Sequence, residues 1–163
     1  MRAADLATLR RLLRLAQEWR LLDRIQRIRV LRGARNREFI LSHALESKCL
    51  AAAPQPLRDV AVLMLETGVR PGEAVGLQWP DVRRQTAVHA KHGYVVIREG
   101  KSRNAKRNLR LTARAAEMLK ARKAAVKSAW TFPGETDEAA FLVSSLDHQH
   151  DDVRTVLKMP PDL

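Results

Sequence analysis

The sequence has few of the residues that many enzyme and binding classes require. It contains one cysteine, Cys49, which excludes an intrachain disulfide framework and a zinc site made from several cysteines. Aromatic residues make up 4% of the chain, with a single tyrosine, Tyr94, so a base-stacking platform for single-stranded nucleic acid is not expected. No apolar run approaches a membrane span, and the arginine-rich start lacks the apolar stretch of a signal peptide. These absences favour a reducing, cytoplasmic setting with no membrane partner.

Motifs for nucleotide chemistry are also missing. The sequence has no P-loop, no glycine-rich dinucleotide fingerprint and no Ser/His/Asp order typical of a hydrolase. We therefore expect neither a nucleotide cofactor nor nucleotide-dependent catalysis.

Positive charge is abundant and unevenly placed. The net charge is +12, and the sequence pI is about 11.0. Residues 1–40 hold eleven arginines against four acidic residues, and residues 83–127 hold fourteen lysines and arginines against two acidic residues. Two basic segments beside a near-neutral one predict a clamp for a polyanion, DNA or RNA, held mainly by ionic contacts.

The hydrophobic pattern predicts a mainly α protein with a small three-stranded antiparallel sheet. Helices are expected over residues 4–22, 42–53, 56–67, 71–75, 113–126 and 149–157, and strands over 87–88, 94–97 and 109–112. The helix over 56–67 is apolar all round and is expected to be buried, whereas the helix over 113–126 should direct its Lys and Arg side chains outward.

Arg70 stands at a predicted junction between two helices. Gly68 suits the end of the first helix, and Pro71 suits the first turn of the second. An arginine fixed in this way either holds the helices together by pairing with Glu73 or Glu66, or grips a phosphate through its planar fork. The local pattern leaves both interpretations open.

A basic hairpin follows over residues 100–107. Its lysine, Lys101, is either a solvated loop residue or a group that contacts phosphate and protonates a leaving oxygen. Lys106 is a second candidate for this role, and the spacing does not choose between them.

Two histidines near the end of the chain form a weaker pattern. His148 and His150 precede Asp151 and Asp152, a group that offers metal ligands. Carboxylates at the expected helix start are explained better by the helix dipole, so no metal site is predicted.

Together, residues 57–82, which contain Arg70-Pro71-Gly72-Glu73, and the hairpin with Gly100-Lys101-Ser102 resemble the catalytic domain of the tyrosine recombinase (phage integrase) family. In that family a tyrosine attacks a DNA phosphodiester and forms a 3′-phosphotyrosyl link without a metal or nucleotide cofactor. Two arginines hold the phosphate, and a hairpin lysine protonates the leaving 5′-oxygen. The resemblance implies that Arg70 is the first arginine, Lys101 is the lysine, and Glu73 supports Arg70.

The family's later motifs, His-x-x-Arg and the nucleophilic tyrosine, have no match in this sequence. We therefore expect a partial catalytic domain, truncated at both ends, and the sequence leaves open whether this chain is itself an enzyme. The resemblance implies that residues 1–30 are the last helix of a core-binding domain, residues 31–41 a linker, and residues 42–163 the first part of the catalytic domain.

The expected partner is double-stranded DNA, in the cytoplasm with the nucleoid, and the family implies a homo-oligomer on that DNA. The residues expected to contact DNA are Arg10, Arg14, Arg35, Arg37, Arg103, Lys106 and Arg107. Two alternatives remain: a non-catalytic DNA-binding or regulatory module, and a basic RNA- or ribosome-associated protein.

Overall fold

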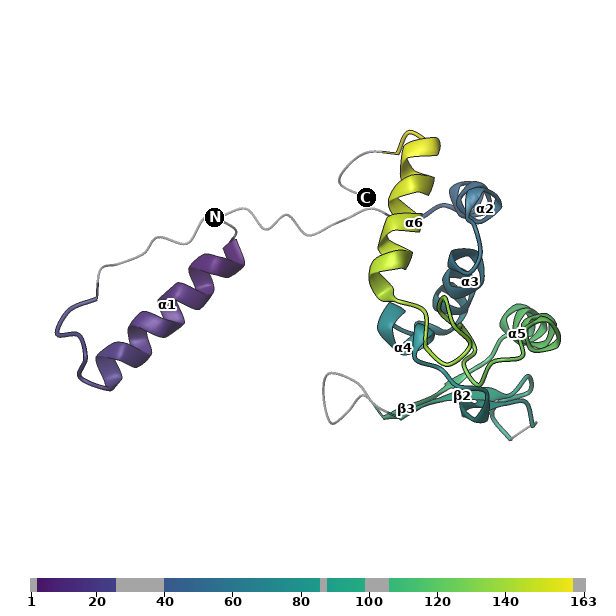
Figure 1. Ribbon diagram of the computed structural model, residues 1–163, viewed down its shortest axis with the longest axis horizontal. Helices are drawn as coiled ribbons and strands as arrows, with labels where there is room; N and C mark the ends of the chain where they lie inside the picture. The colour runs from purple at the N-terminus through teal and green to yellow at the C-terminus, as the bar shows by residue number, and fades with distance from the viewer. Residues whose placement is uncertain (1–2, 26–39, 86–87, 99–105, 160–163) are drawn as a thin grey trace. The chain divides into compact units, whose positions relative to one another are not determined.

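A computed structural model describes residues 3–25, 40–85, 88–98 and 106–159 of the chain. These residues belong to two compact units, Met1–Phe39 and Ile40–Leu163 (Figure 1). Each unit is described by itself. Residues 31–39 of the predicted linker and the tip of the basic hairpin lie outside the described residues.

The first unit contains helix α1 (Ala3–Glu18). The helix ends at Glu18 and not near residue 22, because Arg20 takes a left-handed conformation with φ of 58°. The amide of Leu21 then donates to the carbonyl of Ala16 at 2.8 Å, a pattern that closes a helix C-terminus. Trp19, which follows the last residue of the helix, is 68% exposed.

The second unit is mainly α-helical with one three-stranded antiparallel sheet in the order β1-β2-β3, which confirms the predicted fold class. Its elements are α2 (His43–Ala52), α3 (Leu57–Thr67), α4 (Pro71–Val75), the 3₁₀ turn η1 (Trp79–Asp81), β1 (Val82–Arg83), β2 (Tyr94–Ile97), β3 (Arg107–Arg110), α5 (Ala113–Ala125) and α6 (Val143–Val156).

Helix starts follow the chemistry of single residues. The Ser42 hydroxyl accepts from the amide of Leu45 and caps α2, at the start predicted for this helix. Thr112 caps α5 through the amide of Ala115. Because Thr112 already caps a helix, the third strand ends at Arg110 and not at residue 112 as predicted.

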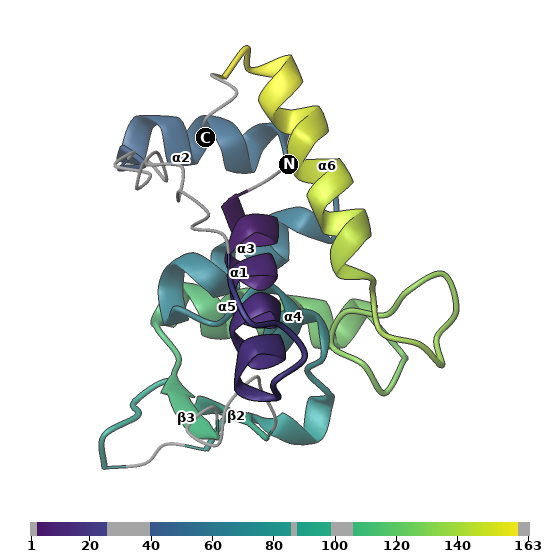
Figure 2. The same cartoon turned by 90° about the vertical axis from the view of Figure 1, so that its left-hand side faces the viewer.

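The sheet has one covered face and one open face. Along β2, Val95 and Ile97 are buried, whereas Tyr94 and Val96 are only half-buried. The buried face packs beneath helices α3 and α5, and no labelled helix lies on the other side of the sheet (Figure 1). The turned view shows α2 and α6 at the opposite end of this unit from β2 and β3 (Figure 2).

The core joins the helices to the covered face of the sheet. Its buried members are Val60, Leu63, Val69, Ala74, Val75, Leu77, Val95, Ile97, Leu111, Ala115, Leu119, Phe132 and Leu146. Helix α3 was predicted to be buried on all sides. This prediction is wrong, because Leu65 is 47% exposed.

Two further elements differ from the prediction. The first described strand is Val82–Arg83. Of the strand predicted over 87–88, residue 87 lies outside the described residues, while Val88 lies in a turn and is 94% exposed. Helix α6 begins at Val143, well before the predicted start at residue 149. Asp151 and Asp152 therefore lie in the second half of the helix, so the explanation of these carboxylates by a helix start is wrong.

Within the described parts of the chain, each helix is too short or too polar to cross a lipid bilayer.

Candidate functional site

The chain holds the backbone of Arg70 between two helices. Helix α3 ends at Gly68, which adopts φ of 69° and donates its amide to the carbonyl of Met64. Val69 is buried, and Arg70 then forms the N-cap of α4, with Pro71 at the first helical position. The predicted roles of Gly68 and Pro71 are confirmed, and Arg70 has little conformational freedom.

Glu73 lies three residues after Arg70 and accepts hydrogen bonds from two arginines. The amide of Arg70 donates to Glu73 Oε2 at 3.1 Å, and Arg70 Nη1 donates to Oε1 at 3.1 Å. From β3, Arg107 Nη1 donates to Oε1 at 3.0 Å and Nη2 to Oε2 at 2.7 Å. Arg107 thus makes the bidentate contact that matches a guanidinium to a carboxylate, and it ties the sheet to α4.

The three side chains differ strongly in exposure. Glu73 is 7% exposed, Arg107 is 29% exposed and Arg70 is 65% exposed. Hydrogen bonds from Arg107, the largest cause, and from Arg70 lower the pKa of Glu73 to about 2, against the opposing effect of burial. The hydrogen bond to Glu73 raises the pKa of Arg107. The carboxylate therefore stays ionised at neutral pH.

Two cations share one anion at this site, so the cluster keeps one positive charge. Within the described residues, the guanidinium of Arg70 contacts protein through Nη1 alone, and its other N–H groups have no acceptor there. A guanidinium carries five donors in a rigid fork. The arrangement can therefore hold an exposed arginine in a fixed place and present it to an external anion.

The structure separates the roles of residues that the sequence grouped together. Arg107, predicted to contact DNA, directs two nitrogens to Glu73. Glu66, the other predicted partner of Arg70, accepts instead from Arg114 at 3.3 Å. Arg114 also contacts Glu46 at 2.7 Å, so this arginine joins α5 to α2 and α3.

The other residues predicted to contact DNA lie in different parts of the chain. Lys106 is exposed and immediately precedes β3, while Arg10 and Arg14 lie on α1 in the first unit. The remaining predicted residues, Lys101, Arg103, Arg35 and Arg37, lie outside the described residues. Lys101 and Lys106 consequently stay as alternatives for the predicted lysine.

Arg122 is an inward-facing arginine that the sequence pattern did not reveal. Its side chain is 11% exposed; Nη1 donates to Asp59 at 2.9 Å, and Nε donates to the carbonyl of Thr131 at 2.6 Å. Its guanidinium also lies 4.4 Å from the centre of the Phe132 ring. The prediction that all basic side chains of this helix point outward is wrong. The signal was its helical spacing from Ala115 and Leu119, both buried.

The only tyrosine of the sequence, Tyr94, lies on the open face of the sheet. It pairs with Arg83 of β1 and with Arg110 of β3. Among the described residues, His, Cys, Asp and Glu side chains do not gather in any group of three or more that offers a metal site.

The structure is similar to the crystal structure of XerA recombinase, with a TM-score of 0.58 and 18% sequence identity. The likeness covers 76% of this chain and 44% of the XerA chain, so this chain spans less than half of that protein. No protein-family model matches the sequence, and no curated protein matches it. At this identity the likeness shows a shared fold.

Proposed function

We propose that this chain is part of a site-specific DNA recombinase of the tyrosine type, and that its second unit binds duplex DNA through the phosphate backbone. Arg70 would contact the phosphate at which strands are exchanged. The proposal includes a cytoplasmic, nucleoid-associated location and a homo-oligomer assembled on DNA.

One observation carries the proposal: Glu73 is buried and already held by the fork of Arg107, yet Arg70 remains 65% exposed beside it. Arg107 alone already contacts both carboxylate oxygens of Glu73, so neutralising that carboxylate does not require Arg70. The exposed guanidinium instead has donors to offer to a phosphate. The similarity to XerA recombinase supports the same class of function.

The chemistry needs three parts. In-line displacement at phosphorus requires charge neutralisation on the phosphate, a nucleophile and an acid for the leaving oxygen. We assign the first part to Arg70 and the third to Lys101, with Lys106 as the alternative. Were a nucleophile supplied to attack the phosphorus, this lysine would give its proton to the 5′-oxygen as the new bond to phosphorus forms and the bond to that oxygen breaks. Glu73 and Arg107 hold Arg70 in position. Since the sequence matches neither His-x-x-Arg nor the late tyrosine, we propose that these residues bind DNA without cutting it.

The proposal is tested by measuring affinity for a labelled DNA duplex across a salt series. Each phosphate contact contributes about 0.9 to the slope of log K against log salt. Arg70→Ala should therefore make the slope about 0.9 less steep, whereas Arg70→Lys should keep most of the slope and lose affinity, because the charge remains without the fork.

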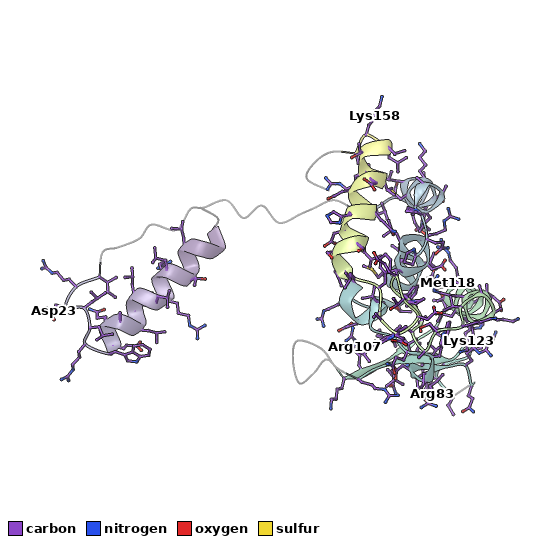
Figure 3. The ribbon with its side chains drawn as sticks, viewed as in Figure 1. Asp23, Arg83, Arg107, Met118, Lys123 and Lys158 are labelled. Carbon is purple, nitrogen blue, oxygen red and sulfur yellow. The ribbon has the colours of Figure 1, made fainter. Side chains whose placement is uncertain are left out.

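The matched control is Lys158→Gln, an exposed cation at the far end of α6 from Arg107 (Figure 3). It should leave the slope unchanged. An Arg70→Ala protein that binds as the wild type does would overturn the phosphate role of Arg70. A covalent complex on a nicked duplex, seen on a denaturing gel, would overturn the proposal that these residues do not cut DNA.

A further inference from the structure

The open face of the sheet carries a row of side chains with an unusual charge pattern. In register, Tyr94 of β2 pairs with Arg83 of β1 on one side and with Arg110 of β3 on the other. Both arginines are exposed. Adjacent strands lie about 4.8 Å apart, so the row places two cations roughly 10 Å apart across an aromatic ring.

These two arginines differ from most described arginines of the second unit, which contact a carboxylate or, in Arg58, two backbone carbonyl groups. Arg70, Arg107, Arg114 and Arg122 each contact an acidic side chain, and Arg98 contacts Asp81. Within the described residues, Arg83, Arg110 and the neighbouring Arg84 have no ion-pair partner. Like charges on one sheet face lower stability when nothing compensates them.

No described α-helix covers this face (Figure 1). Helices α3 and α5 pack on the opposite face, where Val95 and Ile97 enter the core. Arg83 lies at the outer edge of the unit, on the side of the sheet away from these helices (Figure 3). The face is therefore open, and it lies on paired strands. Its two arginines, Arg83 and Arg110, have no acidic partner among the described residues.

We propose that this face is a second duplex-DNA contact surface, in which Arg83 and Arg110 each hold a backbone phosphate and Tyr94 packs between them. Charge complementarity selects a polyanion as the occupant. The choice of DNA rests on the proposed function. The partner is recognised by its backbone and not by its base sequence, because guanidinium contacts to phosphate carry no sequence information.

The second surface is separate from the Arg70 site. Arg107 pairs with Ile97 in register and so belongs to the covered face, from which it reaches Glu73 on α4. Tyr94 and its two arginines occupy the opposite face. The sheet thus lies between the two surfaces, which would contact different stretches of DNA backbone.

The test uses the full chain and a labelled DNA duplex across a salt series. Replacing both residues, Arg83→Gln with Arg110→Gln, should make the slope of log K against log salt about 1.8 less steep, from two lost phosphate contacts. Arg83→Lys with Arg110→Lys should keep the wild-type slope. The matched control, Lys120→Gln with Lys158→Gln, removes the same net charge from α5 and the end of α6 and should leave the slope unchanged.

Two features make the outcome decisive. Neither arginine has a described partner to lose, so the glutamine variant should melt no lower than the wild type, and a changed slope then reports binding. The Arg70→Ala effect should add to the effect of the glutamine variant.

A glutamine variant that has the same slope as its charge control overturns the inference, as does tighter binding of duplex RNA than of duplex DNA at the same salt. If Arg70→Ala has no effect while the glutamine variant does, the Arg70 role fails and this surface stands.

Discussion

Glu73 is the residue on which the Arg70 site depends, because its carboxylate joins α4 to β3. Arg107 supplies the stronger contact, with two nitrogens within 3.0 Å, and Arg70 supplies its amide and one nitrogen. The buried carboxylate therefore fixes an arginine that is itself exposed. Arg122 shows the opposite arrangement, in which the arginine is buried against Asp59 and contributes to the core.

The lowered pKa of Glu73 makes stability depend on acidity in a defined window. The pKa falls from 4.5 to about 2 on folding, so the stabilisation is fully present above about pH 4.5 and is lost as the pH falls toward 2. A shift of this size corresponds to about 3 kcal/mol. Glu73→Gln should remove this part of the pH dependence, measured by chemical denaturation at several pH values.

A control for this measurement is Glu117→Gln, because Glu117 is 76% exposed and its nearest cation, Lys120, is 3.9 Å away. That variant should keep the wild-type pH dependence. If Glu73→Gln lost stability between pH 4.5 and 2 as steeply as the wild type, the ion pair would not be the cause.

At the scale of elements, the site depends on two tight connections. The junction of α3 and α4 sets the backbone of Arg70, and the turn before β2 sets the register that places Tyr94 opposite Arg83. Gly93 closes that turn with φ of 89°, and its carbonyl accepts from the amide of Leu111 at 2.9 Å. A side chain at Gly93 is disfavoured both by the positive φ and by the backbone of Arg83 and Arg84, which occupies the place of the Cβ.

Gly93→Ala should therefore destabilise the sheet. The added Cβ would clash with the carbonyl oxygen of Arg83 and lie 2.9 Å from the Cα of Arg84, in a conformation that costs about 1–3 kcal/mol for a non-glycine residue. Gly72→Ala is the matched control, because its Cβ meets nothing nearer than Val143 at 3.9 Å within helix α4. Thermal melting should show a clear loss for Gly93→Ala and none for Gly72→Ala; equal melting temperatures would contradict the assigned turn.

Local chemistry made some elements predictable and left others hidden. Gly68, Pro71 and Ser42 act through their own backbone or side-chain preferences, so the helix ends that they mark were correct. Strand β1 has two residues and exists because it pairs with Tyr94 and Val95, which a local pattern does not show. Helix α6 begins at Val143, and its N-cap residue Leu142 has no side chain that can cap it, so the sequence carried no signal for this start.

The candidate site was predictable only in part for the same reason. The order of Arg70 and Glu73 is local, and the sequence indicated that they belong together. The role of Arg107 depends on a contact 34 positions away, formed when β3 turns that side chain toward α4. The positive charge of Arg107 suggested contact with DNA, whereas in the tertiary structure its guanidinium donates hydrogen bonds to Glu73.

At the scale of the whole molecule, the net charge of +12 is the feature that favours a nucleic-acid partner. In the second unit, several arginines neutralise acidic side chains, while Arg70 and the open sheet face keep positive charge exposed. This charge is arranged on a fold that is similar to that of XerA recombinase over 76% of this chain.

The central claim is that Arg70 contacts a DNA phosphate. It is tested most directly by NMR, following the Nε–H signal of each arginine while a DNA duplex is added, with the Arg70→Lys protein used to assign the Arg70 signal. We predict that the Arg70 signal shifts on addition of DNA and returns at high salt, while that of Arg122, bonded to the carbonyl of Thr131, stays unchanged. A duplex that binds and shifts other arginine signals, but leaves that of Arg70 in place, would contradict the account.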